Sequence, residues 1–382
     1  MRKTIAGWLW IPFILVGVAS APAGPRDEQW KKVDEAVSKG LPKTAIEHLE
    51  PIIEEAVAEG AYPEAIKAIG KRIALEGNIQ GNKPEEKVTR MEAEIEKAPA
   101  EMKPMMEAVL ANWYWHYFQH NKWRFMRRTQ TSEAPGEDFT TWALPRLFAE
   151  IDKHFQAALS AEAALKKIPV ADYDDLLQKG NMPDGYRPTL YDFVAYNALD
   201  FYTSGEQAAA KPQEAFELAA AGPIFAPAAA FIAWEPETTD EDSPKLKAVR
   251  LYQELLKFHE DDEDKGAFLD ANLARLVFGH NTAFGEEKDT RFKAALKRFV
   301  DLWGDHPVSA RARYHWAKTL HDEATWSPPT RWPRKACRPF PRRSAAGCAT
   351  TWCSRSRPSR PPSPSSGCGT SPGRRSRSAT AT

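Results

Sequence analysis

Short turns that contain Gly and Pro divide the first part of the chain into apolar stripes with helical spacing. Between the turns at 40–42 and 60–63, apolar side chains recur every three or four residues, as in Ile46, Leu49 and Ile53. This spacing places them on one face of an α-helix, and that face must be buried against a neighbour. Because such turns are short, successive helices must pack side by side and antiparallel.

Apolar spacing of three or four continues to residue 324, and no stretch shows the period-two alternation of a β-strand. We expect Thr141, Thr189 and Ser243 to precede helices as capping residues. The sequence therefore predicts an all-α fold, an array of antiparallel helix pairs that resembles tetratricopeptide-type arrays although that repeat's full signature is absent. Helices are expected at 27–39, 42–59, 63–73, 84–97, 102–125, 141–165, 189–201, 244–258, 267–277, 291–303 and 310–324.

The N-terminus is typical of a secretory signal peptide. Arg2 and Lys3 precede an apolar run over 5–18, and Ala19 and Ala21 form a small-x-small cleavage site. The alternative is an uncleaved membrane anchor, but a span needs roughly 20 apolar residues, and this run is shorter and contains Pro12. We expect cleavage after Ala21, export to the periplasm or the extracellular space, and no membrane span in the mature chain.

The composition changes abruptly near residue 326. Residues 327–382 contain no Asp or Glu but hold 12 Lys or Arg, 10 of the 30 Pro and all 4 Cys. One interpretation is a disordered basic arm that binds nucleic acid or another polyanion. The other is that the gene is translated in the wrong frame over this stretch. When the codons that could encode 368–382 are read in a frame shifted by two nucleotides, they permit a segment with the alternating pattern of a β-strand. We favour the second, and predict three parts: a signal peptide (1–21), a helical region (22–325) and a disordered, out-of-frame tail (326–382).

The chain before this tail is acidic and has no cysteine. It carries 40 basic against 52 acidic residues, so it should repel nucleic acid rather than bind it. Without cysteine there is no disulfide, no thiol nucleophile and no zinc–thiolate site in this region. Packing alone must stabilise it.

Few residues suggest chemistry. His116 and His120 lie four apart on one predicted helix, a spacing that can hold zinc, but Tyr117 stands where zinc enzymes place Glu and no third ligand is evident. The aromatic residues over 113–125 could stack on sugar or peptide, although a buried helix interface is the more common use. The acidic run at 260–264 lacks the spacing of a calcium loop. We therefore expect no catalytic residue, no cofactor and no metal, and a non-enzymatic protein.

Three stretches are similar to one protein family. They are 112–125, 186–201, and 30–36 together with 40–45. They resemble the N-terminal helical region of bacterial alpha-2-macroglobulin-like proteins, which are also described as large extracellular α-helical proteins. The resemblance implies a secreted endopeptidase inhibitor in which this helical region precedes β-sandwich domains, a bait segment and, in many members, a Cys-Gly-Glu-Gln thioester. No such motif occurs here, so no trapping residue can be assigned.

Three functions follow as expectations. The first is the non-enzymatic helical scaffold of an alpha-2-macroglobulin-like inhibitor, with a protease or another protein as partner of the full-length family. The second is a free-standing tetratricopeptide-like module that binds a peptide. The third, and the least supported, is an enzyme that uses His116 or His120.

Overall fold

The computed structural model describes residues 26–81, 83–126, 136, 138–177, 180, 182–205 and 215–326. The predicted signal peptide (1–21) lies outside these residues, and so does the predicted tail (326–382) except for Trp326, which is the last residue of a helix; both assignments stay predictions. None of the described helices has the length and apolar character needed to cross a membrane.

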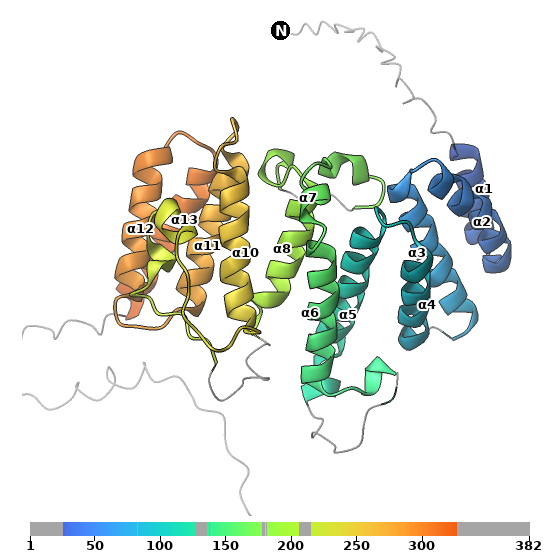
Figure 1. Ribbon diagram of the computed structural model, residues 1–382, viewed down its shortest axis with the longest axis horizontal. Helices are drawn as coiled ribbons and strands as arrows, with labels where there is room; N and C mark the ends of the chain where they lie inside the picture. The colour runs from blue at the N-terminus through green and yellow to red at the C-terminus, as the bar shows by residue number, and fades with distance from the viewer. Residues whose placement is uncertain are drawn as a thin grey trace, which may run out of the picture. The chain divides into compact units, whose positions relative to one another are not determined.

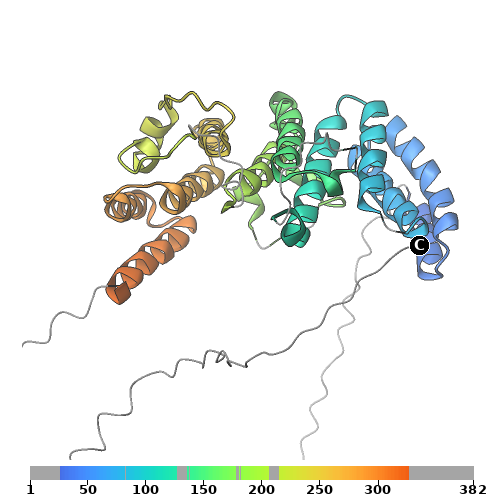
Figure 2. The same ribbon diagram turned by 90° about the horizontal axis from the view of Figure 1, so that it is seen from below.

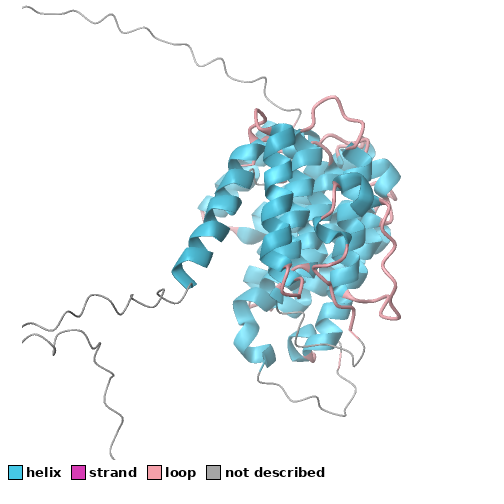
Figure 3. Ribbon diagram, turned by 90° about the vertical axis from the view of Figure 1, so that its left-hand side faces the viewer, coloured by secondary structure: helices cyan, strands magenta, loops and turns pink. Residues whose placement is uncertain are grey.

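The described residues form an all-α fold, as the sequence predicts, and they contain no strand beyond isolated bridges (Figure 3). The longer helices are α1 (Asp27–Ser38), α2 (Pro42–Ala58), α3 (Tyr62–Ile79), α4 (Pro84–Lys97), α5 (Lys103–Met126), α6 (Leu144–Leu159), α8 (Leu190–Tyr202), α10 (Pro244–His259), α11 (Gly266–Thr282), α12 (Lys288–Trp303) and α13 (Val308–Trp326). The short ones are α7 (Glu162–Leu165) and α9 (Ala228–Ile232), with 3-10 turns η1 (Phe139–Thr141), η2 (Val170–Tyr173), η3 (Asp184–Tyr186) and η5 (Pro223–Phe225).

Helices that follow one another in the chain pack against one another. Contacts run from α1 through α2, α3, α4 and α5 to α6, then from α6 through α8 and α10 to α13. Figures 1 and 2 show α1 to α4 as neighbours in chain order. Gly40 and Gly60 have φ of 69° and 73° and end α1 and α2, a conformation that favours glycine. The helical-repeat character predicted from these turns is confirmed.

One predicted cap is wrong, and another is confirmed in position only. Thr141 belongs to η1, and α6 begins later, at Leu144, because Pro145 occupies its first turn and starts the helix there. The same predicted helix also ends early, at Leu159, and α7 is a separate turn. Ser243 precedes α10 as expected, but its side chain makes no capping hydrogen bond, since Pro244 already sets the helix start. Thr189 is confirmed: with Asp192 it forms a complete capping box at α8.

The aromatic residues of α5 are mainly core, as the sequence favours. Tyr114, Trp115, Phe118 and Phe125 are buried, and the Trp115 ring packs against the rings of Phe118, Phe148 and Phe201. Trp123 departs from this pattern, since 63% of it is exposed.

A buried arginine holds the irregular segment before α10. Arg275 on α11 is 1% exposed and donates to the carbonyl oxygens of Ile224 and Ala226 and to Asn272 Oδ1. Its guanidinium also lies 4.5 Å from the ring centroid of Phe231. Burial lowers the pKa of Arg275 to about 9. These contacts explain how the segment interrupted by Pro223 and Pro227 packs on α11 without forming a long helix itself.

Candidate functional site

The candidate site begins where two stretches that resemble the family, 112–125 and 186–201, meet. Trp115 on α5 donates from Nε1 to Asp200 Oδ2 on α8 at 3.1 Å, and Phe201 packs against the Trp115 ring. The aromatic contacts fix the relative position of the two helices. Their polar residues on the outer side of this contact then face a common hollow.

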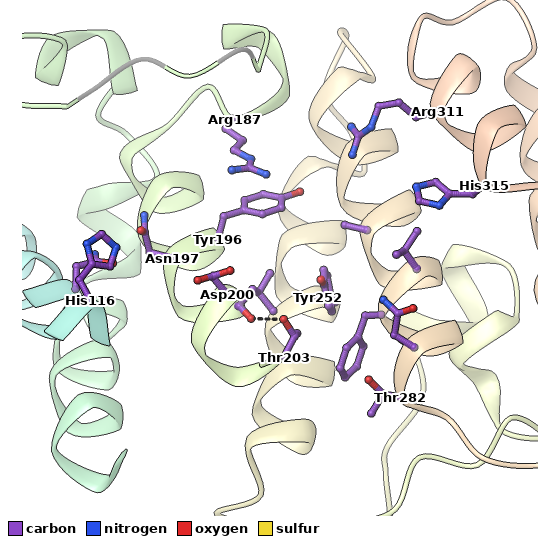
Figure 4. A pocket seen from close by; sticks show the side chains of 16 residues that line it. His116, Arg187, Tyr196, Asn197, Asp200, Thr203, Tyr252, Thr282, Arg311 and His315 are labelled. Atoms are coloured by element: carbon purple, nitrogen blue, oxygen red, sulfur yellow. Dashed lines mark hydrogen bonds between the residues drawn. The ribbon is translucent and has the colours of Figure 1, made fainter. Parts of the chain in front are cut away.

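This hollow, called here the arginine hollow, has a volume of about 520 Å³ (Figure 4). Helices α5, α8, α10, α11 and α13 each contribute to its walls. The polar side chains that line it are Asn112, His116, Arg187, Tyr196, Asn197, Asp200, Thr203, Tyr252, Asn281, Thr282, Arg311 and His315.

Arg187 is held by a stacking contact. It follows η3, and its guanidinium carbon lies 3.7 Å from the ring centroid of Tyr196 on α8 (Figure 4). Stacking on an aromatic face leaves the N–H groups in the guanidinium plane directed outward. Gly266 lets η3 approach α11 this closely, because a Cβ there would lie 3.0 Å from the carbonyl oxygen of Gly185.

A buried carboxylate stands between two arginines. Asp270 on α11 is fully buried and forms an ion pair with Arg311 of α13, while its Oδ2 lies 3.8 Å from Arg187 Nε. Both arginine side chains remain partly exposed, 36% for Arg187 and 43% for Arg311. Asp270 therefore anchors two cations whose remaining donors reach solvent.

Three buried polar atoms in this cluster have no hydrogen bond within the described residues. They are Arg187 Nε, the Tyr196 hydroxyl and Asp270 Oδ2. Burial, and then the charge of Asp270, raises the pKa of Tyr196 well above its usual value, so this hydroxyl stays protonated and can donate. Arg187 Nε lies 3.8 Å from Asp270 Oδ2, and Asp270 also acts on Tyr196, so these groups are neighbours that hold one another in place.

A second hollow of about 650 Å³ shares Arg187 and Arg311 with the first. Its walls include apolar side chains from Val170, Leu177, Met182, Pro183 and Phe193, and the acidic residues Asp174 and Asp184 also line it. The two arginines thus stand between a polar and a more apolar space. This pairing suits a ligand that carries an anionic group next to an apolar one.

The residues singled out in the sequence are placed as follows. His116 lines the arginine hollow, whereas the ring Nδ1 of His120 contacts the backbone oxygen of His116 at 2.8 Å. No group of three metal-ligating side chains in the described part of the chain includes either histidine. The acidic run 260–264 lies between α10 and α11, where Asp262 contacts His259 and Asp264 accepts from the backbone of Gly266.

A buried histidine joins the α8 cap to the end of α10. His259, which is 1% exposed, lies 2.8 Å from Asp192 Oδ1 through Nε2 and 2.6 Å from Asp262 Oδ2 through Nδ1. The other oxygen of Asp192 accepts from the backbone N–H and the hydroxyl of Thr189. Burial acts to lower the pKa of His259, but its hydrogen bonds and ion pairs with both carboxylates outweigh burial and raise it.

This raised pKa predicts a pH dependence of stability. The protonated His259 contributes stability that is fully present below the unfolded pKa of about 6.5 and is lost as pH rises through the folded value. We expect the free energy of unfolding of the wild type to fall, relative to that of His259→Gln, between pH 6 and pH 9. Urea denaturation at both pH values measures this difference. If the difference in free energy of unfolding between the two proteins is the same at pH 6 and pH 9, the pKa of His259 is not raised in the folded protein.

Comparison of the chain with protein-family models, with curated proteins and with solved structures gives no match.

Proposed function

We propose that this chain is a non-enzymatic helical docking module that binds an acidic segment of a partner protein between Arg187 and Arg311. The observation that carries the proposal is the pair of partly exposed arginines, Arg187 and Arg311, that the buried Asp270 anchors at the hollow. A carboxylate from a partner would accept hydrogen bonds from the solvent-facing N–H groups of Arg187 and Arg311, whose side chains are partly exposed. Charge-assisted bonds of this kind, often bidentate with arginine, are the strong ones in recognition sites.

The second hollow adds a preference for the neighbouring side chain. Its apolar wall begins directly beside the two arginines, so an apolar residue next to the acidic one can be buried there. A peptide with Asp or Glu beside Leu, Ile or Phe fits both spaces.

The wider context rests on the sequence resemblance. We propose that the module is the helical N-terminal scaffold of an exported alpha-2-macroglobulin-like endopeptidase inhibitor. Two of the stretches that carry the resemblance, 112–125 and 186–201, supply one wall of the arginine hollow. The alternative is a free-standing peptide-binding module with the same site. Sequencing the gene beyond the codon for Thr382 separates them, because only the first requires macroglobulin-type domains in a shifted frame.

Peptide selection tests the docking site. A random library of 12-residue peptides selected on the wild-type protein should enrich peptides with an acidic residue beside an apolar one. Arg187→Gln should weaken the binding of those peptides about tenfold or more, because it removes the charge and the planar fork of donors. Fluorescence polarisation with the labelled peptides measures the dissociation constants, and circular dichroism checks the fold of the variant.

Arg250→Gln is the matched control. Arg250 is an exposed arginine of α10, paired with Glu241, and it does not line either hollow. Its replacement should leave peptide affinity unchanged. Selected peptides that bind wild type and Arg187→Gln equally well would show that the arginine hollow is not the docking site.

A further inference from the structure

Four ionisable side chains meet inside the bundle formed by α4, α5 and α6. Glu92 comes from α4, Glu107 from α5, and Glu150 and His154 from consecutive turns of α6. The spacing of four between Glu150 and His154 puts both on one face of the helix. This cluster is made of residues that line neither the arginine hollow nor the second hollow.

His154 is oriented by one carboxylate and directed toward two others. It is 5% exposed, and its Nδ1 lies 2.6 Å from Glu107 Oε2. Its Nε2 is buried and forms only a 3.4 Å ion-pair contact with Glu150 Oε1, without hydrogen-bond geometry. Such a contact satisfies a buried ring nitrogen only in part, so a closer partner would stabilise it.

The geometry supplies such a partner. One ligand atom each from Glu92, Glu150 and His154 lies within 4.8 Å of the other two. Around a four-coordinate zinc ion, ligand atoms are about 3.4 Å apart, because each bond to N or O is about 2.1 Å long. Small rotamer adjustments of the two glutamates would close this gap. Neither glutamate is fully buried, so they can move.

The surroundings match those of a metal-binding histidine. A histidine that ligates a metal almost always donates its other ring N–H to a carboxylate or carbonyl, which fixes the tautomer. Glu107 is placed to do this for His154. The negative charge is only partly offset: the protonated His154 pairs with Glu107 and Glu150, Lys153 contacts Glu150 at 2.6 Å with 67% of its side chain exposed, and Tyr114 donates to Glu92 at 3.4 Å. A divalent cation would balance the remaining carboxylate charge.

We propose that Glu92, Glu150 and His154 bind one divalent transition-metal cation of the zinc class, with Glu107 holding the histidine in place. Imidazole with carboxylate ligands suits zinc rather than calcium or magnesium, which prefer oxygen ligands alone. Water completes the coordination. The ion links α4 to α6 across α5 and so stabilises the packing of these helices. This departs from the expectation, drawn from the sequence alone, that the chain holds no metal.

Zinc titration of the full chain tests the site, after metal is removed with EDTA and the cysteines are alkylated. Alkylation is needed because Cys337, Cys348, Cys353 and Cys368 could bind zinc independently. We expect calorimetry with zinc chloride to give one ion per chain, and the melting temperature to rise by about 5 °C when zinc is present at 100 times its dissociation constant. Zinc binding should also displace a proton from His154, so the measured enthalpy should depend on the ionisation enthalpy of the buffer.

Matched variants decide whether this cluster is responsible. His154→Gln should weaken zinc binding more than 100-fold, and Glu107→Gln about 10-fold to 100-fold, because its carboxylate only orients the ligand. His120→Gln, which changes an exposed histidine, should bind zinc as the wild type does. If His154→Gln fails to fold, Glu92→Gln takes its place, since Glu92 is only partly buried. No zinc binding by the wild type, or equal binding by wild type and the ligand variants, would overturn the proposal.

Discussion

Replacing Trp115 with alanine should lower the free energy of unfolding by about 3–5 kcal/mol, the range found when large aromatic side chains are removed from a core. Trp115 is 2% exposed and packs against the rings of Phe118, Phe148 and Phe201. Its loss would leave a cavity where α5, α6 and α8 meet, and it would also remove the hydrogen bond to Asp200. Urea denaturation followed by circular dichroism measures the change.

Trp123→Ala on the same helix is the control. Because 63% of Trp123 is exposed, we expect a change within about 0.5 kcal/mol, as for other surface substitutions. Both variants remove an indole from α5, so helix propensity changes alike in the two. Equal destabilisation by the two substitutions would show that the Trp115 cluster is not the core of this region.

Arg275→Ala should destabilise the protein by about 3 kcal/mol or more, because two buried carbonyl oxygens lose their donor. These oxygens belong to Ile224 and Ala226, in the segment that covers α11. We expect this segment to become sensitive to limited proteolysis before the rest of the chain unfolds, since Arg275 holds it from α11. Denaturation curves and mass spectrometry of the cleavage products measure both effects.

Arg250→Ala, at an exposed arginine, provides the comparison and should be nearly neutral. If the Arg275→Ala protein is as stable as the Arg250→Ala protein, water replaces the guanidinium without loss of stability. In that case the buried arginine would not be what holds the 224–226 segment.

The fold class could be predicted from the sequence because its signals are local. Apolar spacing and the Gly40 and Gly60 turns define helices and their ends, and short turns define which helices pack. The cap at Thr189 could be predicted for the same reason, because its capping box lies within four consecutive residues. The error at Thr141 shows the limit: a hydroxyl before an apolar run resembles a cap, but Pro145 placed the helix start three residues later.

The candidate sites were harder to predict because their residues come together only in the folded chain. Arg187 lies in a stretch that the sequence singled out, yet nothing local indicates that Asp270 and Arg311 will join it. Glu150 and His154 stand four apart in the sequence but were not singled out there, and Glu92 and Glu107 come from other helices. His116 and His120 show the opposite case, since a suggestive spacing meets no third ligand among the described residues.

The docking proposal depends on a direct contact between Arg187 and an acidic side chain of the bound peptide. A double-mutant cycle measures this contact, with Arg187→Gln in the protein and Glu→Gln or Asp→Asn in a selected peptide. We expect the two changes not to be additive, with a coupling energy of about 1.5–3 kcal/mol, as for hydrogen bonds to charged groups. Additive effects, with no coupling between Arg187 and the acidic residue, would contradict it.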